Sequence, residues 1–278
     1  MTSRVIGGPA VLRFSGAGVS DVGLVRADNE DSAYVGPYLV VVADGVGGAA
    51  AGEVASATAT HAMVTTVVDR ADDLPEVVLR EGAELACASV QRGVQADLRR
   101  LGMATTLTAL VCDGRRAVLG HVGDSRAYLL RGGRLEQVSR DHTYVQRMVD
   151  NGEMDRGTAL RHPWRHVVLR SVDGDPVHEA IDLVPVPIAA GDRVLLCSDG
   201  LTDLVPDPAV ADLLVSTPDP HSAAAVLVRA ALTAGGRDNV TCVVADVVDG
   251  PEVVGEGRLL GAASELANVV DPRSVRGR

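Results

Sequence analysis

The chain has 278 residues, of which 46% are apolar and only 2% aromatic, so it can bury a substantial and mainly aliphatic core in one large or two small domains. Its net charge of −11 and its lack of a basic run argue against nucleic acid or an anionic membrane as a partner. All 26 basic residues are arginine, which excludes a Walker phosphate loop and any mechanism that needs a catalytic lysine.

The first predicted elements are strands. Val11 to Ser15 and Val22 to Arg26 are expected to form a hairpin around Gly16-Ala17-Gly18. The acidic run from Ala27 to Asp31 follows, and its local sequence suits either a solvated loop or a functional site. Leu39 to Gly48 then predicts an apolar strand, buried on both faces, that ends in an aspartate followed by three glycines in four positions.

The middle of the chain predicts two helices, from Ala49 to Val68 and from Leu74 to Leu101, the second capped by Asp73 with Pro75 in its first turn. The strands expected next are Ala104 to Cys112, Ala117 to Val122, Ala127 to Leu130 and Arg134 to Val138. The elements expected after them are a helical segment from Thr143 to Asn151, an irregular stretch from 152 to 182, a strand from Arg193 to Ser198, helices from Pro208 to Val215 and from Ser222 to Ala234, and a strand from Val240 to Val247. Two runs of strands separated by two long helices predict two sheets with helices outside.

The end of the chain predicts a small extension. Residues 1–250 are expected to form the main domain, and residues 251–278 a C-terminal segment. Its apolar positions suit an amphipathic helix packed on the domain, although an interaction tail is the alternative. These positions are Leu259, Leu260, Ala263, Leu266 and Val270.

Aspartates recur where predicted strands end or begin. Asp44 ends one apolar strand, Asp199 ends another, and Asp238 directly precedes the last strand. Each alone could open a turn. Because a buried carboxylate is costly unless it is compensated, three of them at strand edges favour a shared divalent cation.

The four cysteines, Cys87, Cys112, Cys197 and Cys242, lie scattered in apolar contexts without a Cys-x-x-Cys pair. This pattern predicts buried thiols in a reducing compartment. We find no secretory signal and no apolar run of membrane-spanning length, so we expect a soluble cytoplasmic protein.

Five ordered motifs resemble those of the metal-dependent type 2C serine/threonine protein phosphatases, in the form found beside bacterial, and especially actinobacterial, Ser/Thr kinases. They are Val22-Gly23-x-Val25-Arg26-x-x-Asn29-Glu30-Asp31, Ala43-Asp44-Gly45-Val46-Gly47-Gly48, Gly123-Asp124-Ser125-Arg126, Ser198-Asp199-Gly200-Leu201 and Asp238-Asn239-Val240-Thr241. The resemblance covers roughly residues 10–248. It implies an α+β fold, a four-layer α-β-β-α sandwich of two antiparallel sheets flanked by helices, with metals at one end of the sheets.

The resemblance also implies roles for single residues. Asp44 would bridge two Mn²⁺ or Mg²⁺ ions, and the carbonyl oxygen of Gly45 would bind one of them. Asp199 would bind one metal and Asp238 the other. Arg26 would grip the substrate phosphate with its planar guanidinium.

Further residues would support these two ions. Glu30 and Asp31 would hold metal-bound waters, with Asn239 beside them. Asp124 would help Asp199 to bind a third, weaker metal. Hard oxygen ligands suit Mg²⁺ or Mn²⁺ rather than zinc, and two such ions about 3.5–4 Å apart can create a bridging hydroxide that attacks phosphorus without a phosphoenzyme.

The chain departs from the family at two places. Val46 stands where animal members carry a histidine thought to protonate the leaving alcohol, so a metal-bound water is the first candidate for that role and His142 the second. Residues 145–182 correspond to the variable flap. Its Arg161, His162, Arg165 and His166 form either an exposed basic loop or a contact for acidic or phosphorylated substrate.

The predicted function is dephosphorylation of phosphoserine and phosphothreonine in proteins, by a monomer that works with a Ser/Thr kinase system. One alternative is a stress-response phosphatase that acts on a small anti-anti-sigma-like partner. The other is a catalytically weak type 2C-like binding or regulatory module. The presence of Asp44, Asp199, Asp238 and Arg26 argues against that module.

Overall fold

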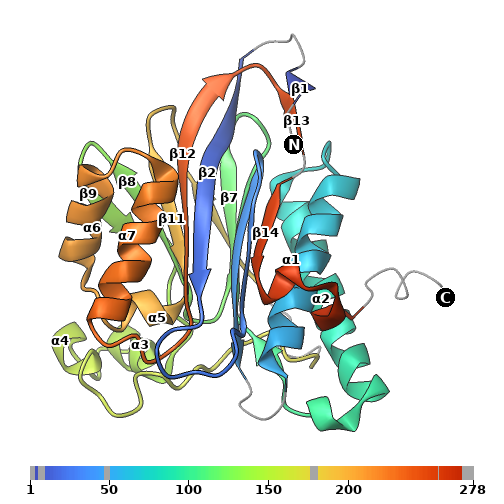
Figure 1. Ribbon diagram of the computed structural model, residues 1–278, viewed down its shortest axis with the longest axis vertical. Helices are drawn as coiled ribbons and strands as arrows, with labels where there is room; N and C mark the ends of the chain where they lie inside the picture. Colours follow the sequence, from blue (N-terminus) through green and yellow to red (C-terminus); the bar gives the residue numbers. More distant parts are fainter. Residues whose placement is uncertain (1–3, 6–9, 47–50, 176–180, 256, 271–278) are drawn as a thin grey trace.

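The computed structural model describes residues 4–5, 10–46, 51–175, 181–255 and 257–270 of the chain. Two antiparallel sheets stand face to face between two pairs of helices (Figure 1). The seven-stranded sheet has the order β10 (Asp182–Val186), β7 (Ala117–Val122), β6 (Leu107–Cys112), β4 (Leu39–Val46), β3 (Asp31–Val35) and β14 (Arg258–Gly261), with the short β5 (Ala104–Thr105) also paired to β4. The five-stranded sheet has the order β2 (Val11–Asp21), β12 (Val240–Gly250), β11 (Arg193–Cys197), β8 (Arg126–Arg131) and β9 (Arg134–Gln137). The predicted four-layer sandwich of antiparallel sheets is therefore confirmed.

The helices cover the outer faces of the sheets. Figure 1 shows one pair beside the seven-stranded sheet, the other pair beside the five-stranded sheet, and three short helices near one end of the strands. The first pair is α1 (Gly52–Asp69) and α2 (Pro75–Ala96), the second is α6 (Asp207–Ser216) and α7 (Pro220–Thr233), and the short helices are α3 (Tyr144–Asp150), α4 (Arg156–Ala159) and α5 (Asp199–Thr202). In the described part of the chain, no helix combines the length and the apolar character that crossing a bilayer requires.

Strand β4 shows how an aliphatic run builds this sandwich. Its residues 39–43 are buried on both faces, and they alternate between two cores. Leu39 and Val41 pack in the core under α1 and α2, whereas Val40 and Val42 pack between the sheets. Because successive side chains of a strand point to opposite faces, a continuous apolar run suits a sheet that is covered on both sides.

The expected hairpin at the start of the chain is wrong, because Val11–Asp21 forms the single long strand β2. This strand pairs with β12 over eleven positions, from Val11 opposite Gly250 to Asp21 opposite Val240. Its glycines allow close packing rather than a turn. A Cβ on Gly16 would lie 2.5 Å from the Cβ of Ala245.

Helix α2 is shorter than expected, and the predicted cap is wrong. The N-cap is Leu74, whereas Asp73 accepts a hydrogen bond from the side chain of Arg70. The helix ends at Ala96, and a 3-10 turn over Leu98–Arg100 follows, capped by the carboxylate of Asp97. Helix α1 begins at Gly52, and the two alanines expected to begin it, 49–50, lie outside the described residues.

The expected C-terminal helix is also wrong. The segment instead forms a short strand β13 (Val253–Val254) paired with β1 (Arg4–Val5), then β14, and then 3-10 turns over Ala262–Ser264 and Leu266–Asn268. Leu260 packs between the sheets and Leu259 against the other face, as a strand requires. Gly261 follows with φ +61°, where a Cβ would lie 2.1 Å from the carbonyl oxygen of Asp31.

Among its described residues, the stretch expected to be irregular contains helix α4 (Arg156–Ala159), and it leads into a strand. Helix α4 begins after Asp155, whose carboxylate accepts a hydrogen bond from the backbone N–H of Thr158. Strand β10, which the sequence left unassigned, pairs with β7 at the edge of the larger sheet. Prolines within and just after it obscured the strand pattern, since proline is tolerated at a sheet edge but not in its interior.

Candidate metal centre

The predicted aspartates lie at one end of the two sheets. Asp31 begins β3 directly opposite Asp44 near the end of β4. Asp199 opens α5 after β11, and Asp238 precedes β12, the neighbour of β11. Asp124 lies in the turn between β7 and β8, which belong to different sheets. The topology thus brings together carboxylates that are up to 207 positions apart in sequence.

These carboxylates act on one another electrostatically. Burial raises the pKa of Asp44 well above its usual range, and the charges of Asp31, Asp199, Asp124 and Asp238 raise it further. Burial and the same neighbourhood likewise raise the pKa of Asp199. The pKa of Asp31 rises to about 6 and that of Asp124 to about 7, in both cases mainly through burial. The cluster is therefore costly to ionise without a compensating positive charge.

Asp31 supplies a second sign that a positive group belongs here. Its side chain is fully buried, and Oδ2 accepts a 2.7 Å hydrogen bond from Ser198 Oγ. Its Oδ1 is buried without a hydrogen-bond partner among the described residues. Buried carboxylate oxygens normally have partners. An all-oxygen donor set with an orphaned carboxylate oxygen fits hard divalent cations with bound waters.

Backbone contacts fix the position of Asp44. Its N–H donates to Thr106 Oγ1, and its carbonyl oxygen accepts from Thr105 Oγ1, each at 2.9 Å. Gly45 follows at a point with no room for a side chain, since a Cβ would lie 2.4 Å from the carbonyl oxygen of Gly52. The Asp-Gly pair thus combines a half-buried carboxylate with a tightly packed backbone.

Asn239 holds the loop that carries Arg26. Its Oδ1 accepts from the N–H of Glu30 at 2.8 Å, and its Nδ2 donates to the carbonyl oxygens of Val22 and Asp28, each at 2.9 Å. One side chain therefore closes both ends of the 22–30 segment. Burial raises the pKa of Glu30, and the charge of Glu53 raises it further.

Arg26 lies at the rim of this centre. Its NH2 donates to Asp238 Oδ2 at 2.8 Å, and both side chains are nearly half exposed, at 46% and 43%. This hydrogen bond and the nearby charges of Glu30 and Asp44 raise the pKa of Arg26. A guanidinium in this position can reach an anion that approaches the carboxylates from solvent.

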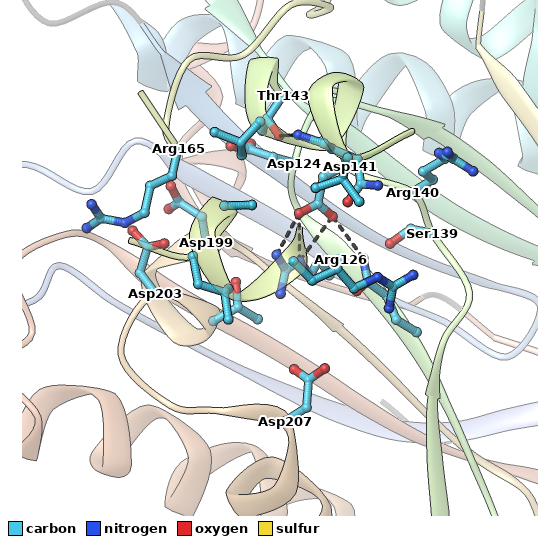
Figure 2. A pocket seen from close by; sticks show the side chains of 18 of the residues that line it. Asp124, Arg126, Ser139, Arg140, Asp141, Thr143, Arg165, Asp199, Asp203 and Asp207 are labelled. Atoms are coloured by element: carbon cyan, nitrogen blue, oxygen red, sulfur yellow. Dashed lines mark hydrogen bonds and ion pairs between the residues drawn. The ribbon is translucent and has the colours of Figure 1, made fainter. Parts of the chain in front are cut away.

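A cavity of about 590 Å³ opens beside the carboxylates (Figure 2). Asp124, Asp199 and Asp203 line it from the sheet side, and Arg165 and His166 from the flap. Donor atoms of His166, Asp199 and Asp203 all lie within 4.8 Å of one another, so they could hold a cation. The sequence prediction missed Asp203, although its position four residues after Asp199 places both on one helical face.

The four flap residues singled out from the sequence do not all lie at the cavity. Arg165 and His166 face the cavity, and His166 Nδ1 lies 3.1 Å from Asp203 Oδ2. His162 instead belongs to an aromatic cluster, with its ring 5.8 Å from Trp164 and 6.1 Å from Tyr144. Arg161 does not line the cavity within the described part of the chain. Arg161, Arg165 and His166 are exposed, whereas His162 is half-buried.

His142 is unsuited to the acid role considered for it. Its Nδ1 accepts a hydrogen bond from the N–H of Gly123 at 3.0 Å, and its Nε2 lies 3.0 Å from Asp182 Oδ2. Both ring nitrogens are occupied, and burial lowers the pKa of the imidazole. Val46 is 43% exposed and offers no proton.

Comparison with known proteins gives a consistent result. The family model described as protein phosphatase 2C matches residues 16–234. The serine/threonine protein phosphatase PstP of Mycobacterium tuberculosis is 44% identical over 247 residues, which are 86% of this chain but only 46% of that protein. The serine/threonine phosphatase stp of Listeria monocytogenes is 33% identical, with 82% of this chain and 93% of that protein covered.

A solved structure of the catalytic domain of PstP in complex with two manganese ions matches 86% of this chain and 100% of that one, with 41% identity and a TM-score of 0.73. The family model thus spans most of the chain. The chain therefore belongs to the protein phosphatase 2C family.

Proposed function

We propose that the chain is a metal-dependent protein phosphatase for phosphoserine and phosphothreonine. The observation that carries this proposal is the mutual electrostatic influence of Asp44, Asp199 and Asp238 at one end of the sheets, with Arg26 beside them. The relatives named above, which bear the name serine/threonine phosphatase, support it. Because the chain spans less than half of the mycobacterial relative, the activity, substrates and partners of the whole protein belong to this proposal.

We further propose which residues hold the cations. Asp44 would bridge two Mn²⁺ or Mg²⁺ ions, the carbonyl oxygen of Gly45 would bind one of them, and Asp199 and Asp238 would bind one each. When bound, such ions supply Lewis-acid activation of water and neutralise phosphoryl oxygens. The two manganese ions of the related catalytic domain support this choice of cation.

Four further residues would complete the centre. Asp124 would join Asp199 at a third, weaker cation site, which the raised pKa of both carboxyl groups supports. Glu30 and Asp31 would orient waters. Both carboxylates belong to the cluster, and Asp31 Oδ1 has no hydrogen-bond partner among the described residues. Asn239 would keep the loop of Glu30 in place.

The protein's own groups would bind and orient the substrate. Arg26 would exchange part of its contact with Asp238 for two phosphoryl oxygens. The burial of Asp31 and the hydrogen bonds that hold the backbone of Asp44 would keep the carboxylates aligned before substrate arrives. No nucleophilic side chain is needed, and no histidine at position 46 or 142 is available to protonate the leaving alcohol.

The test is release of phosphate from phosphothreonine peptides by the purified chain. The proposal expects release with Mn²⁺, none after a chelator removes it, and recovery when Mn²⁺ returns. A chain that binds phosphopeptides with Mn²⁺ present but does not turn them over would instead be a type 2C-like binding module.

The location, oligomeric state, substrates and domain boundaries of the enzyme also belong to this proposal. We propose that it acts as a cytoplasmic monomer on phosphoproteins made by a Ser/Thr kinase system. Residues 1–250 would form the catalytic domain and 251–278 its extension. The pairing of β14 with β3 supports an extension that packs on the domain.

A further inference from the structure

His142 and Gly123 are joined by two reciprocal hydrogen bonds. The N–H of Gly123 donates to His142 Nδ1 at 3.0 Å, and the N–H of His142 donates to the carbonyl oxygen of Gly123 at 2.8 Å. Gly123 directly precedes Asp124, whose carboxylate faces the metal centre and lines the cavity. His142 thus holds the backbone next to a candidate cation ligand.

The turn that carries Asp124 needs such support because it crosses between the two sheets. Gly123 has φ +109°, a conformation that only glycine adopts readily. On the other side of the turn, Ser125 Oγ lies 2.7 Å from Thr106 Oγ1, the same hydroxyl that accepts from the N–H of Asp44. The turn is therefore tied to the Asp44 strand at one end and to His142 at the other.

The neighbours of His142 determine where its proton lies. Because Nδ1 accepts from a backbone N–H, only Nε2 of the neutral ring can carry the proton, and Nε2 lies 3.0 Å from Asp182 Oδ2 and 2.8 Å from Arg170 NH1. Arg170 NH1 donates to Asp182 Oδ1 at 2.9 Å and so fixes that carboxylate. The ring also packs against His121, with centroids 4.9 Å apart.

The same histidine fixes the return of the flap. The N–H of Leu169 donates to the carbonyl oxygen of His142 at 2.7 Å, and Thr143 pairs with Val168 in a short antiparallel bridge. Arg170, which holds Asp182, follows directly. His142 therefore lies where the Asp124 turn, the end of the flap and the edge strand β10 meet.

We propose that His142 is a positioning residue: its Nδ1 holds the Gly123–Asp124 turn in the conformation that binds the weaker cation, and Asp182 and Arg170 hold the Nε2 edge of the ring in place. The part about the cation rests on the proposed function. The part about the turn rests on the hydrogen bonds alone and can be tested without metal.

Two substitutions separate the two ends of the imidazole. In His142→Asn the amide oxygen can take the place of Nδ1 as acceptor, whereas the donor to Asp182 is lost. In His142→Gln the longer amide can keep a donor near Asp182, whereas the acceptor for Gly123 is lost. His221→Gln, at an exposed histidine in α7, controls for the change of side chain.

Hydrogen exchange of the metal-free protein is the first readout. We expect the Gly123 amide to exchange at least tenfold faster in His142→Gln than in the wild type, and His142→Asn to stay close to the wild type. Equal exchange in all variants, or equal loss of protection in both His142 variants, would overturn the positioning role, because neither outcome depends on Nδ1.

Mn²⁺ titration followed by electron paramagnetic resonance is the second readout. We expect His142→Gln to weaken the weaker class of sites by roughly 10–100-fold, the usual effect of removing a group that orients a ligand, with the tight sites unchanged. If the exchange result holds but the weak site is unaltered, the link from the turn to the cation is refuted. If even the wild type binds no Mn²⁺, the proposed function fails while the exchange result stands.

Discussion

Arg26 NH2 lies 2.8 Å from Asp238 Oδ2, so the arginine expected to bind phosphate is paired with a carboxylate expected to bind a metal. Both side chains are nearly half exposed, and an ion pair of this kind contributes only about 0.2–1 kcal/mol. The pair is therefore weak enough to open when a cation and a phosphate arrive together. It also means that the two proposed roles can be separated by mutation.

Removing Arg26 should have opposite effects on the two ligands. Arg26→Ala should raise KM for a phosphothreonine peptide and change kcat less, since it removes a contact to phosphate rather than to water. Mn²⁺ should bind up to about fivefold more tightly, because Asp238 loses a competing cation worth at most about 1 kcal/mol. Steady-state kinetics and calorimetric Mn²⁺ titration measure both effects. An unchanged KM would contradict the phosphate role.

Asp44→Asn should abolish activity and yet stabilise the metal-free fold. The substitution removes a buried charge whose pKa is raised by burial and by Asp31, so the apo protein should melt at a higher temperature. It should also lower turnover by roughly 100-fold or more and cancel the rise in melting temperature that Mn²⁺ gives the wild type. Asp212→Asn, at an exposed position, is the matched control and should change neither property. A variant that keeps most of the turnover would refute the bridging role.

The stability of the metal-free protein should rise as the pH falls from 8.0 to 6.5. The pKa of Asp124 is about 7 and that of Asp31 about 6, against 3.8 ordinarily, so the folded state takes up protons that the unfolded chain does not. This stabilisation is complete when the pH is below the pKa that the carboxyl groups have in the unfolded chain. It is lost as the pH rises through the pKa that they have in the folded protein. Burial lowers the pKa of His121 to about 3, so this histidine opposes the trend, but only below about pH 6.5.

Thermal unfolding at the two pH values measures this dependence. Saturating Mn²⁺ should flatten or reverse it, because cations bind the deprotonated carboxylates. Asp124→Asn should also flatten it in the metal-free protein. A metal-free wild type that is more stable at pH 8.0 than at 6.5 would show that the carboxylates do not share one buried cluster.

Asn239→Ala should weaken both the fold and substrate binding. The variant leaves the N–H of Glu30 and the carbonyl oxygens of Val22 and Asp28 without their partner, which should cost about 2–4 kcal/mol in urea unfolding. KM should rise as well, because Arg26 lies within the released loop. Asn151→Ala, at an exposed asparagine, should change stability by no more than about 0.5 kcal/mol. A KM equal to that of the wild type would argue against loop control of Arg26.

The layers of the fold could be predicted from local patterns because aliphatic runs such as β4 and amphipathic helices such as α7 are long and regular. The expected hairpin at the start of the chain failed because its glycines have a packing role. Gly16 and Gly18 resemble a turn in sequence, yet they lie inside β2 because β12 and Leu260 approach too closely for a Cβ. The pairing of β14 with β3 likewise depends on a distant strand.

Asp44, Asp199 and Asp238 could be identified from their positions at strand ends, and the family resemblance linked them to Asp31 and Asp124. The sequence could not show how they meet, because Asp124 arrives through a turn that crosses between sheets. It also could not place His166 opposite Asp203, since the flap lacks regular spacing. The role of His142 required the distances to Gly123 and Asp182.

Diffraction at the manganese absorption edge from crystals soaked in Mn²⁺ would locate the bound ions. We expect two strong anomalous peaks at the ends of the sheets, with the Asp44 carboxylate in contact with both and Asp199 and Asp238 in contact with one each. Peaks at other acidic residues only, or an Asp44 carboxylate that touches no ion, would contradict the proposed metal centre.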